Sequence, residues 1–197
     1  MRGVLHFLNT APVLQFLEKL TGIDGVIPDP YYQGGGLHQI EPGGRLSIHT
    51  DFAALPNLRI ERRLNLILYL NKDWEEAYGG HLELWQPDMS ECVHKVLPVF
   101  NRCVVFTISD DSWHGHPTLL ACPQGMTRRS LATYYYTSYT RPEELAGSRR
   151  TTWRARPGSS DPRRPNRRPK AAVLRSVAGA ILPPIVVHAA RRLSGRK

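Results

Sequence analysis

Short apolar segments separated by turn residues run through the middle of this 197-residue chain, and they constrain its fold more than any other feature. Each has roughly 5 to 7 residues of strand character, and Gly, Pro, Asn and Asp mark the turns between them. The clearest are residues 64–70, 81–85, 103–107 and 131–136. Residues 37–137 have room for about eight such strands. The pattern predicts a mainly β (α+β) fold, a double-stranded β-helix or jelly roll.

One helix signal precedes the strands. Thr10 stands where an N-cap residue is favoured, and Gly22 stands where a helix commonly stops. Between them the apolar residues recur at helical spacing. These residues are Val13, Leu14, Phe16, Leu17 and Leu20. The sequence therefore predicts an amphipathic N-terminal helix over residues 11–21.

The charge of the chain is divided unevenly between two parts. Residues 1–140 carry 11 Lys/Arg against 14 Asp/Glu, whereas residues 141–197 carry 15 against 3. The basic character thus belongs to an appendage and says little about what the body binds. We expect one folded domain over 1–140 and a flexible basic linker over 141–170, where Gly, Ser, Pro and Arg supply few apolar anchors. A helical basic tail is expected over 171–197.

The basic tail suggests an alternative function, in which the protein binds a surface and does not act as an enzyme. Residues 171–195 regain apolar character with helical periodicity on both sides of Pro183-Pro184. Such a unit is suited to docking on the body, on a protein partner or on an anionic membrane surface. The alternative function is therefore an anionic-surface or nucleic-acid binding protein in which the β domain is a non-catalytic scaffold. Because no aromatic residues are interleaved with the tail's basic ones, no specific nucleic acid is expected.

Cysteine usage and hydropathy indicate the compartment. Cys92, Cys103 and Cys122 are odd in number and lack zinc-type spacing, and no signal peptide with a cleavage site precedes them. No uninterrupted apolar run approaches the roughly 18 residues that a membrane span needs. We expect a cytoplasmic, reducing location.

A candidate metal site begins at His49-Thr50-Asp51. In a strand, the side chains of His49 and Asp51 project from the same face and can hold one metal ion. The second histidine is His114 or His116, which lie two residues apart and would also share a face. Gly115 beside His114 would leave room for a bulky co-substrate and O2, which favours His114. Two histidines and one carboxylate with open positions are the ligand set of non-haem Fe(II) oxygenases, so Fe(II) is preferred to zinc.

A candidate anion anchor follows at Arg128-Arg129. A planar guanidinium can hold a carboxylate through two parallel hydrogen bonds, but only one of two neighbours in a strand can point inward. With Arg128 inward, Ser130 would supply a hydroxyl donor, and Ala132 and Tyr134 would line a narrow pocket. With Arg129 inward, Leu131, Thr133 and Tyr135 would line it instead. The first arrangement is favoured.

Several further segments together resemble the Fe(II)/2-oxoglutarate dioxygenases of the prolyl 4-hydroxylase type, from about residue 10 to 140. The motifs are Gly35-Gly36-Leu37-His38, Pro42-Gly43-Gly44, His49-Thr50-Asp51, Tyr69-Leu70-Asn71-Lys72-Asp73-Trp74, Gly79-Gly80-His81-Leu82-Glu83-Leu84-Trp85, His114-Gly115-His116-Pro117 and Arg128-Arg129-Ser130-Leu131-Ala132. The resemblance implies that His49, Asp51 and His114 bind iron. It implies that Arg128 binds the distal carboxylate of the co-substrate 2-oxoglutarate and that Tyr69 hydrogen-bonds the same molecule.

The resemblance also implies the reaction, a C–H hydroxylation that consumes O2 and releases succinate and CO2, with ascorbate as a suggested further cofactor. The substrate is peptidyl proline or a small metabolite, and the expected loops over residues 51–63 and 86–101 would select it. About 36 residues precede the first expected barrel strand. This is fewer than is usual in the family, so we expect an N-terminal supporting helix and strand to be missing.

Overall fold

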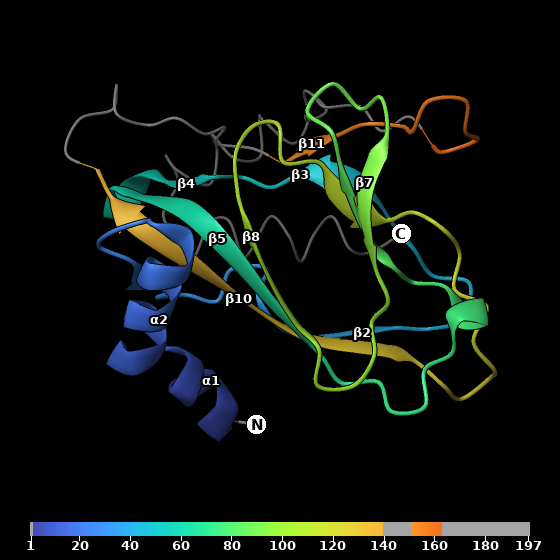
Figure 1. Cartoon of the computed structure of the whole chain (residues 1–197), viewed down its shortest axis with the longest axis horizontal. Helices are drawn as coiled ribbons and strands as arrows, with labels where there is room; N and C mark the ends of the chain where they lie inside the picture. Colours follow the sequence, from blue (N-terminus) through green and yellow to red (C-terminus); the bar gives the residue numbers. More distant parts are fainter. Residues whose placement is uncertain (1, 140–150, 163–197) are drawn as a thin grey trace, which may run out of the picture. The chain divides into compact units, whose positions relative to one another are not determined.

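The computed structural model describes residues 2–139 and 151–162, which form two antiparallel β-sheets with helices at the N-terminal end. The larger sheet is centred on its two longest strands, which pair along most of their length (Figure 1). These are β5 (Ile60–Tyr69) and β10 (Arg128–Ser138). Outer strands flank this pair: β1 (Ile27–Pro28) and β2 (Gly36–Ile40) on β10, β4 (Ala54–Leu55) and β8 (Cys103–Thr107) on β5.

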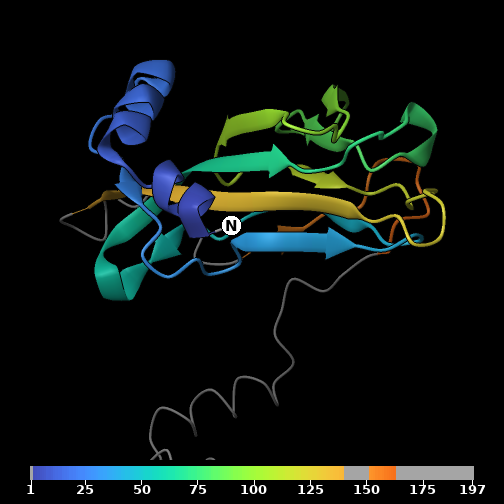
Figure 2. The same cartoon turned by 90° about the horizontal axis from the view of Figure 1, so that it is seen from below.

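The smaller sheet has five strands in the order β11-β3-β9-β6-β7. Their bounds are β3 (Leu46–Thr50), β6 (Leu82–Trp85), β7 (Cys92–Val96), β9 (His114–His116) and β11 (Thr152–Trp153). In the view turned by 90°, β5, β10 and β2 of the larger sheet run side by side (Figure 2). The structure is thus mostly β with antiparallel sheets, in agreement with the predicted jelly-roll-like fold.

The predicted helix is confirmed as α2 (Ala11–Thr21), and a second helix, α1 (Arg2–Leu8), precedes it without having been predicted. Gly22 ends α2 in the left-handed region at φ 69°, as its position indicated. Thr10 does occupy the N-cap position, but the expected side-chain cap is wrong. Its hydroxyl donates instead to the carbonyl of Phe7, 2.7 Å away in the preceding helix.

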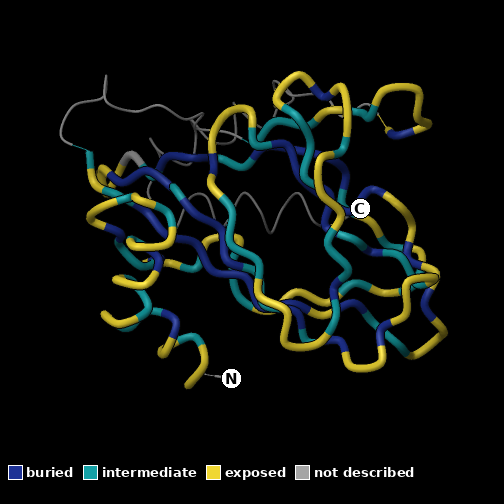
Figure 3. The backbone as a smooth tube through the Cα atoms, viewed as in Figure 1, coloured by how far each residue is buried: buried dark blue, intermediate teal, exposed yellow. Residues whose placement is uncertain are grey.

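The helices cover one face of the larger sheet, and the opposite face is turned to the interior of the roll. Apolar side chains of α1 and α2 pack against alternate residues of the central strands. The buried members of this cluster are Leu8, Leu17, Val26, Leu64, Leu66, Leu131 and Tyr135. The buried positions follow the sheet strands, whereas the helices and connecting loops carry most exposed ones (Figure 3). The period-2 alternation of strands therefore leaves Asn65, Ser130 and Tyr134 on the inner face.

Two expectations about loops are corrected by the structure. The predicted linker includes residues 151–162, yet Thr152 and Trp153 form β11 and pair with β3. The strand β4, a short 3-10 helix and the beginning of β5 fall within the predicted loop over 51–63. The strand β7 falls within the predicted loop over 86–101. Short strands whose partners are distant in sequence leave little local signal, because their stability comes from the partner. Residues 140–150 and the predicted tail over 171–197 lie outside the described residues.

Two short 3-10 helices complete the described elements, at Pro56–Leu58 and Glu76–Tyr78. Helices α1 and α2 and the short strand β1 all precede β2. None of the helices in the described ranges combines the length and apolar character that a membrane crossing requires.

Candidate metal centre and adjoining cavity

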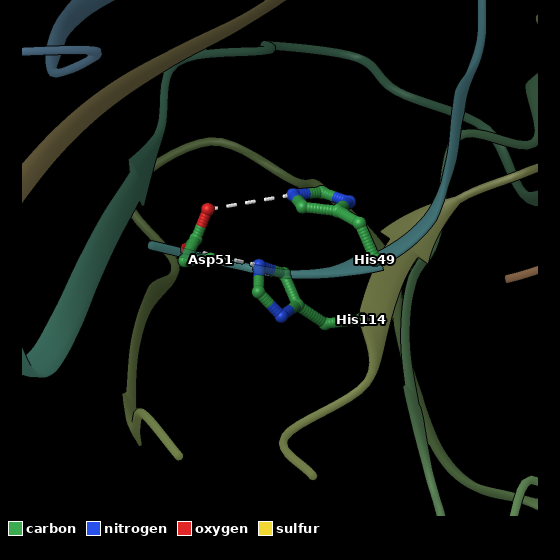
Figure 4. A group of neighbouring side chains, drawn as sticks. All are labelled: His49, Asp51 and His114. Atoms are coloured by element: carbon green, nitrogen blue, oxygen red, sulfur yellow. Dashed lines mark ion pairs between the residues drawn. The ribbon is translucent and has the colours of Figure 1, made fainter. Parts of the chain in front are cut away.

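Three side chains that are distant in sequence converge between the sheets (Figure 4). His49 lies in β3 and is the cross-strand partner of His114 in β9, while Asp51 directly follows β3. One ligand atom from each residue lies within 4.8 Å of the others. The Nε2 atoms of His49 and His114 lie 3.5 Å and 3.3 Å from the Asp51 carboxylate oxygens. The structure thus brings together the three predicted ligands in a geometry that can surround one cation.

The second nitrogen of each histidine determines which atom is free for a metal. The Nδ1 of His49 lies 2.9 Å from the carbonyl oxygen of Ser47, and that of His114 lies 2.8 Å from that of Ser112. A carbonyl only accepts, so Nδ1 carries the proton in both neutral rings. Nε2, which faces the carboxylate in both rings, is then the atom that can bind a metal once it carries no proton. This arrangement, with backbone carbonyls orienting the rings, is typical of metal-ligating histidines.

The charge states also suit a metal. Burial lowers the pKa of His49 below its usual value and so favours the neutral ring. Burial alone would raise the pKa of Asp51. The adjacent imidazoles of His114 and His49 and the charge of Arg62 lower this pKa by more than burial raises it, so Asp51 is a carboxylate at neutral pH. Two neutral nitrogens and one anionic oxygen are the donors that Fe(II) accepts. The residues present therefore fit the metal that the sequence predicted.

Arg62 and Asn65 support Asp51, and sequence reasoning missed both. The Arg62 guanidinium and the Asn65 amide each donate to Oδ2 of Asp51 at 2.8 Å, and Arg62 also donates to the Asn65 carbonyl oxygen at 2.8 Å. The guanidinium lies 3.3 Å above the ring centroid of Tyr134. Residues three apart in a strand normally face opposite sides, but the pairing register shifts where Tyr135 and Tyr136 of β10 meet Leu64 and Arg62 of β5. This bulge places both side chains on the inner face.

Trp153 is the other neighbour that was missed. It lies opposite His49 in the β11–β3 pair, and the two rings have centroids 4.7 Å apart. The sequence held one signal for this contact. Trp153 stands alone in a segment otherwise rich in Arg, Gly, Ser and Pro, and a large apolar ring in such a segment usually packs against the folded domain.

Arg128 points into the roll and Arg129 points away from it. The Arg128 side chain is buried; its Nε donates to the Gly80 carbonyl at 2.8 Å, and Nη2 lies 3.4 Å from the Tyr69 hydroxyl. Arg129 is exposed and donates to Thr127. In the part of the chain that the structure describes, Arg128 forms no ion pair with a carboxylate. A buried cation of this kind favours an anionic ligand.

A cavity of about 100 Å³ joins the His49–Asp51–His114 cluster to Arg128. Other residues around it include His38, Ile40, Leu46, Asn65, Ile67, Leu82, Gly115, His116, Ser130, Ala132 and Tyr134. Ser130, Ala132 and Tyr134 thus share the cavity face with Arg128. Tyr69 is not among the residues that line the cavity and is placed behind Arg128 by its hydroxyl contact.

His116 also lines this cavity but is not in the metal-ligand cluster. Burial, with smaller effects from Arg128 and His49, lowers its pKa to about 3. Gly115 lines the cavity too, and the structure adds a second reason for a glycine here: a Cβ atom would lie 2.8 Å from the carbonyl oxygens of Leu46 and Ser47. Glycine is needed because β3 approaches β9 closely at this point.

Comparisons with known proteins agree with this geometry. A family model described as the 2OG-Fe(II) oxygenase superfamily matches residues 35–136. A curated relative, prolyl 3-hydroxylase OGFOD1 of Mus musculus, is 33% identical over 86 residues, which are 41% of this chain and 15% of that protein.

Solved structures of related proteins match more loosely. A prolyl-4-hydroxylase of Pseudomonas putida is 25% identical with a TM-score of 0.38, covering 54% of this chain and 52% of that one. A prolyl 4-hydroxylase structure from Phytophthora capsici is 24% identical with a TM-score of 0.46, covering 70% and 44%. The chain therefore spans about half or less of the length of each of these proteins.

Proposed function

Because the chain belongs to the 2OG-Fe(II) oxygenase superfamily, we propose that it is an Fe(II)- and 2-oxoglutarate-dependent dioxygenase that hydroxylates a C–H bond. The observation that carries this proposal is a single cavity lined both by a metal-ligand set and by a buried guanidinium that has no carboxylate partner among the described residues. A 2-oxo dicarboxylate has the matching chemistry, a chelating end and an anionic end. The oxidoreductase assignment follows from the same pair of features.

Each residue has a defined task in this proposal. His49, Asp51 and His114 would hold Fe(II) and leave other coordination positions open. Fe(II), when bound, supplies the activation of O2 that couples decarboxylation of 2-oxoglutarate to insertion of one oxygen atom into the substrate, with succinate and CO2 as products. Arg128 would bind the distal carboxylate through its free guanidinium hydrogens, because Nε is already engaged with Gly80.

The supporting residues orient this machinery. The Tyr69 hydroxyl contacts the Arg128 guanidinium and would set its position, while Ser130 supplies a hydroxyl on the cavity face. Arg62 and Asn65 hold Oδ2 of Asp51, which lies 3.3 Å from His114 Nε2, and leave Oδ1 facing His49 Nε2 at 3.5 Å. These contacts prepare the site before any ligand arrives, which reduces the reorganisation that binding requires.

For the substrate we propose a peptidyl prolyl residue, and the support is the match to a relative named as a prolyl 3-hydroxylase. A small metabolite is the competing outcome of the assay. The residues of the site are compatible with either substrate, because their task is to aim the target carbon and to exclude water.

Succinate formation tests the function. Full-length protein would be incubated with Fe(II), 2-oxoglutarate and O2, with and without ascorbate, against proline-containing peptides and a panel of small metabolites. We expect substrate-dependent succinate from wild type and none above background from Asp51→Ala. His94→Ala is the matched control, because His94 is exposed on β7 of the smaller sheet. Failure of wild type to bind 2-oxoglutarate in the presence of Fe(II) would contradict the proposal.

A further inference from the structure

His116 is a buried imidazole for which neither ring nitrogen has a hydrogen-bond partner among the described residues. Only 3% of the residue is exposed. Leaving a buried donor or acceptor unpaired is costly, so such a group in a folded protein calls for an explanation. In His49 and His114, by contrast, Nδ1 is satisfied by a backbone carbonyl.

The position of His116 points to the anion end of the cavity. It shares a strand face with His114 but lies two residues farther along β9, roughly 6.6 Å away. Among the described residues, His116 alone lines both the inner cavity and a second hollow of about 620 Å³, which Gly80 lines as well. Arg128 donates to the Gly80 carbonyl and lines the inner cavity. His116 and Arg128 thus line the same cavity.

A carboxylate bound beside Arg128 can accept more hydrogen bonds than the free N–H groups of Arg128 donate. The Arg128 Nε is engaged with Gly80, and Nη2 lies near the Tyr69 hydroxyl. A carboxylate has about four lone-pair positions on its two oxygens. An imidazole carries at least one N–H donor in either protonation state, so its donation does not depend on titration.

We propose that His116 is a positioning residue that donates a hydrogen bond to the distal carboxylate of the bound 2-oxo acid, beside Arg128. This inference deepens the proposed function and rests on it. It also accounts for one of the two unpaired nitrogens, because the ligand supplies the partner of the donating N–H.

The test compares two ligands that differ only in the distal carboxylate. Full-length protein loaded with Fe(II) under anaerobic conditions would be titrated by calorimetry with 2-oxoglutarate and with 2-oxopentanoate, which has the same chain length without that group. His116→Leu should weaken 2-oxoglutarate binding by about 10-fold to 100-fold, the loss typical of one hydrogen bond to a charged group. Binding of 2-oxopentanoate should change by no more than about twofold. His94→Leu, an exposed histidine on β7, should change neither.

Two further measurements separate positioning from a merely structural role. His116→Gln keeps an N–H donor and should recover part of the lost 2-oxoglutarate affinity. The thermal midpoint of ligand-free His116→Leu should equal or exceed that of wild type, because leucine removes two unpaired buried nitrogens. The increase in midpoint on adding 2-oxoglutarate should be smaller in this variant.

Each contrary outcome has a distinct meaning. Equal losses for the two acids would overturn the contact with the distal carboxylate. A loss of Fe(II) affinity in His116→Leu as large as in His114→Ala would make His116 a metal ligand, which also overturns the proposal. If wild type binds Fe(II) but not 2-oxoglutarate, the proposed function fails first and this inference fails with it.

Discussion

The indole of Trp153 packs against the imidazole of His49, with ring centroids 4.7 Å apart and planes inclined by 31°. The contact joins a segment from the far end of the described chain to β3, which carries His49 and leads directly into Asp51. Next to it, the Arg154 amide donates to the Ile48 carbonyl at 3.0 Å. Farther along, the Arg156 guanidinium makes two hydrogen bonds to the Asp161 carboxylate and lies 3.8 Å from Glu83 of β6. The segment over 151–162 is therefore part of the site's support.

Trp153→Ala should weaken Fe(II) binding by about tenfold, because residues that orient a metal-ligating histidine usually contribute that much to affinity. Competition with a chromophoric chelator under anaerobic conditions measures the effect. Trp153→Phe keeps an aromatic ring against His49 and should recover most of the affinity. Unchanged affinity in the alanine variant would show that β3 holds His49 in place without this packing.

Arg62→Met should lower the free energy of unfolding of the metal-free protein by about 3 kcal/mol, because it removes the buried cation that compensates the partly buried Asp51 carboxylate. Adding Mn(II), a redox-stable divalent ion, should restore part of this loss, since the metal becomes the counter-ion. Urea unfolding with and without the metal gives both values. Arg63→Met is the matched control, because the side chain of Arg63 contacts the Thr137 hydroxyl, at 3.5 Å. An equal effect of the two substitutions would contradict the assignment.

Gly115→Ala should lower the free energy of unfolding by about 2 kcal/mol, the usual cost of forcing an extra carbon into a packed interior. The added Cβ would meet two backbone carbonyls of β3 that have little freedom to move. Because β3 and β9 carry His49 and His114, Fe(II) affinity should fall as well. Gly3→Ala is the control: nothing lies within 4 Å of its added Cβ in α1, and alanine favours a helix. Chemical denaturation of both variants checks the contrast.

Acid should destabilise the metal-free protein below about pH 6.5, through buried histidines. Burial lowers the folded-state pKa of both His49 and His116 below the usual 6.5, so the unfolded state binds more protons as the pH falls through that value. Stability is then lost toward acid, by up to about 1.4 kcal/mol per pH unit for each histidine. For His116 the loss should continue down to pH about 3.

Urea unfolding at pH 7.5 and 5.5 measures this dependence, and we expect a loss of about 2 kcal/mol in wild type. His116→Leu should show a clearly smaller loss, since one of the two groups is gone. The same pH dependence in both proteins would remove His116 from the explanation. Fe(II) affinity should fall over the same range, because protons compete for the Nε2 atoms.

Much of the site could be predicted because its chemistry is local. His49 and Asp51 are two residues apart in a strand, and that spacing alone places both on one face. The inward position of Arg128 was favoured because Ser130, Ala132 and Tyr134 would share its face, and the structure has all four around the cavity. The helix over 11–21 has a repeating apolar pattern and a glycine stop, which also act within a few residues.

The residue chemistry and the alternation of faces along each strand follow from the order of residues alone. Tertiary packing sets which strand lies beside which: that Trp153 meets His49, that a bulge turns Arg62 inward to Asp51, and that His114 completes the cluster while His116 lines the cavity with Arg128. The physical reason is that these contacts join residues 11 to 104 positions apart. Strand pairing and register depend on packing across the whole roll, and no local pattern encodes that packing.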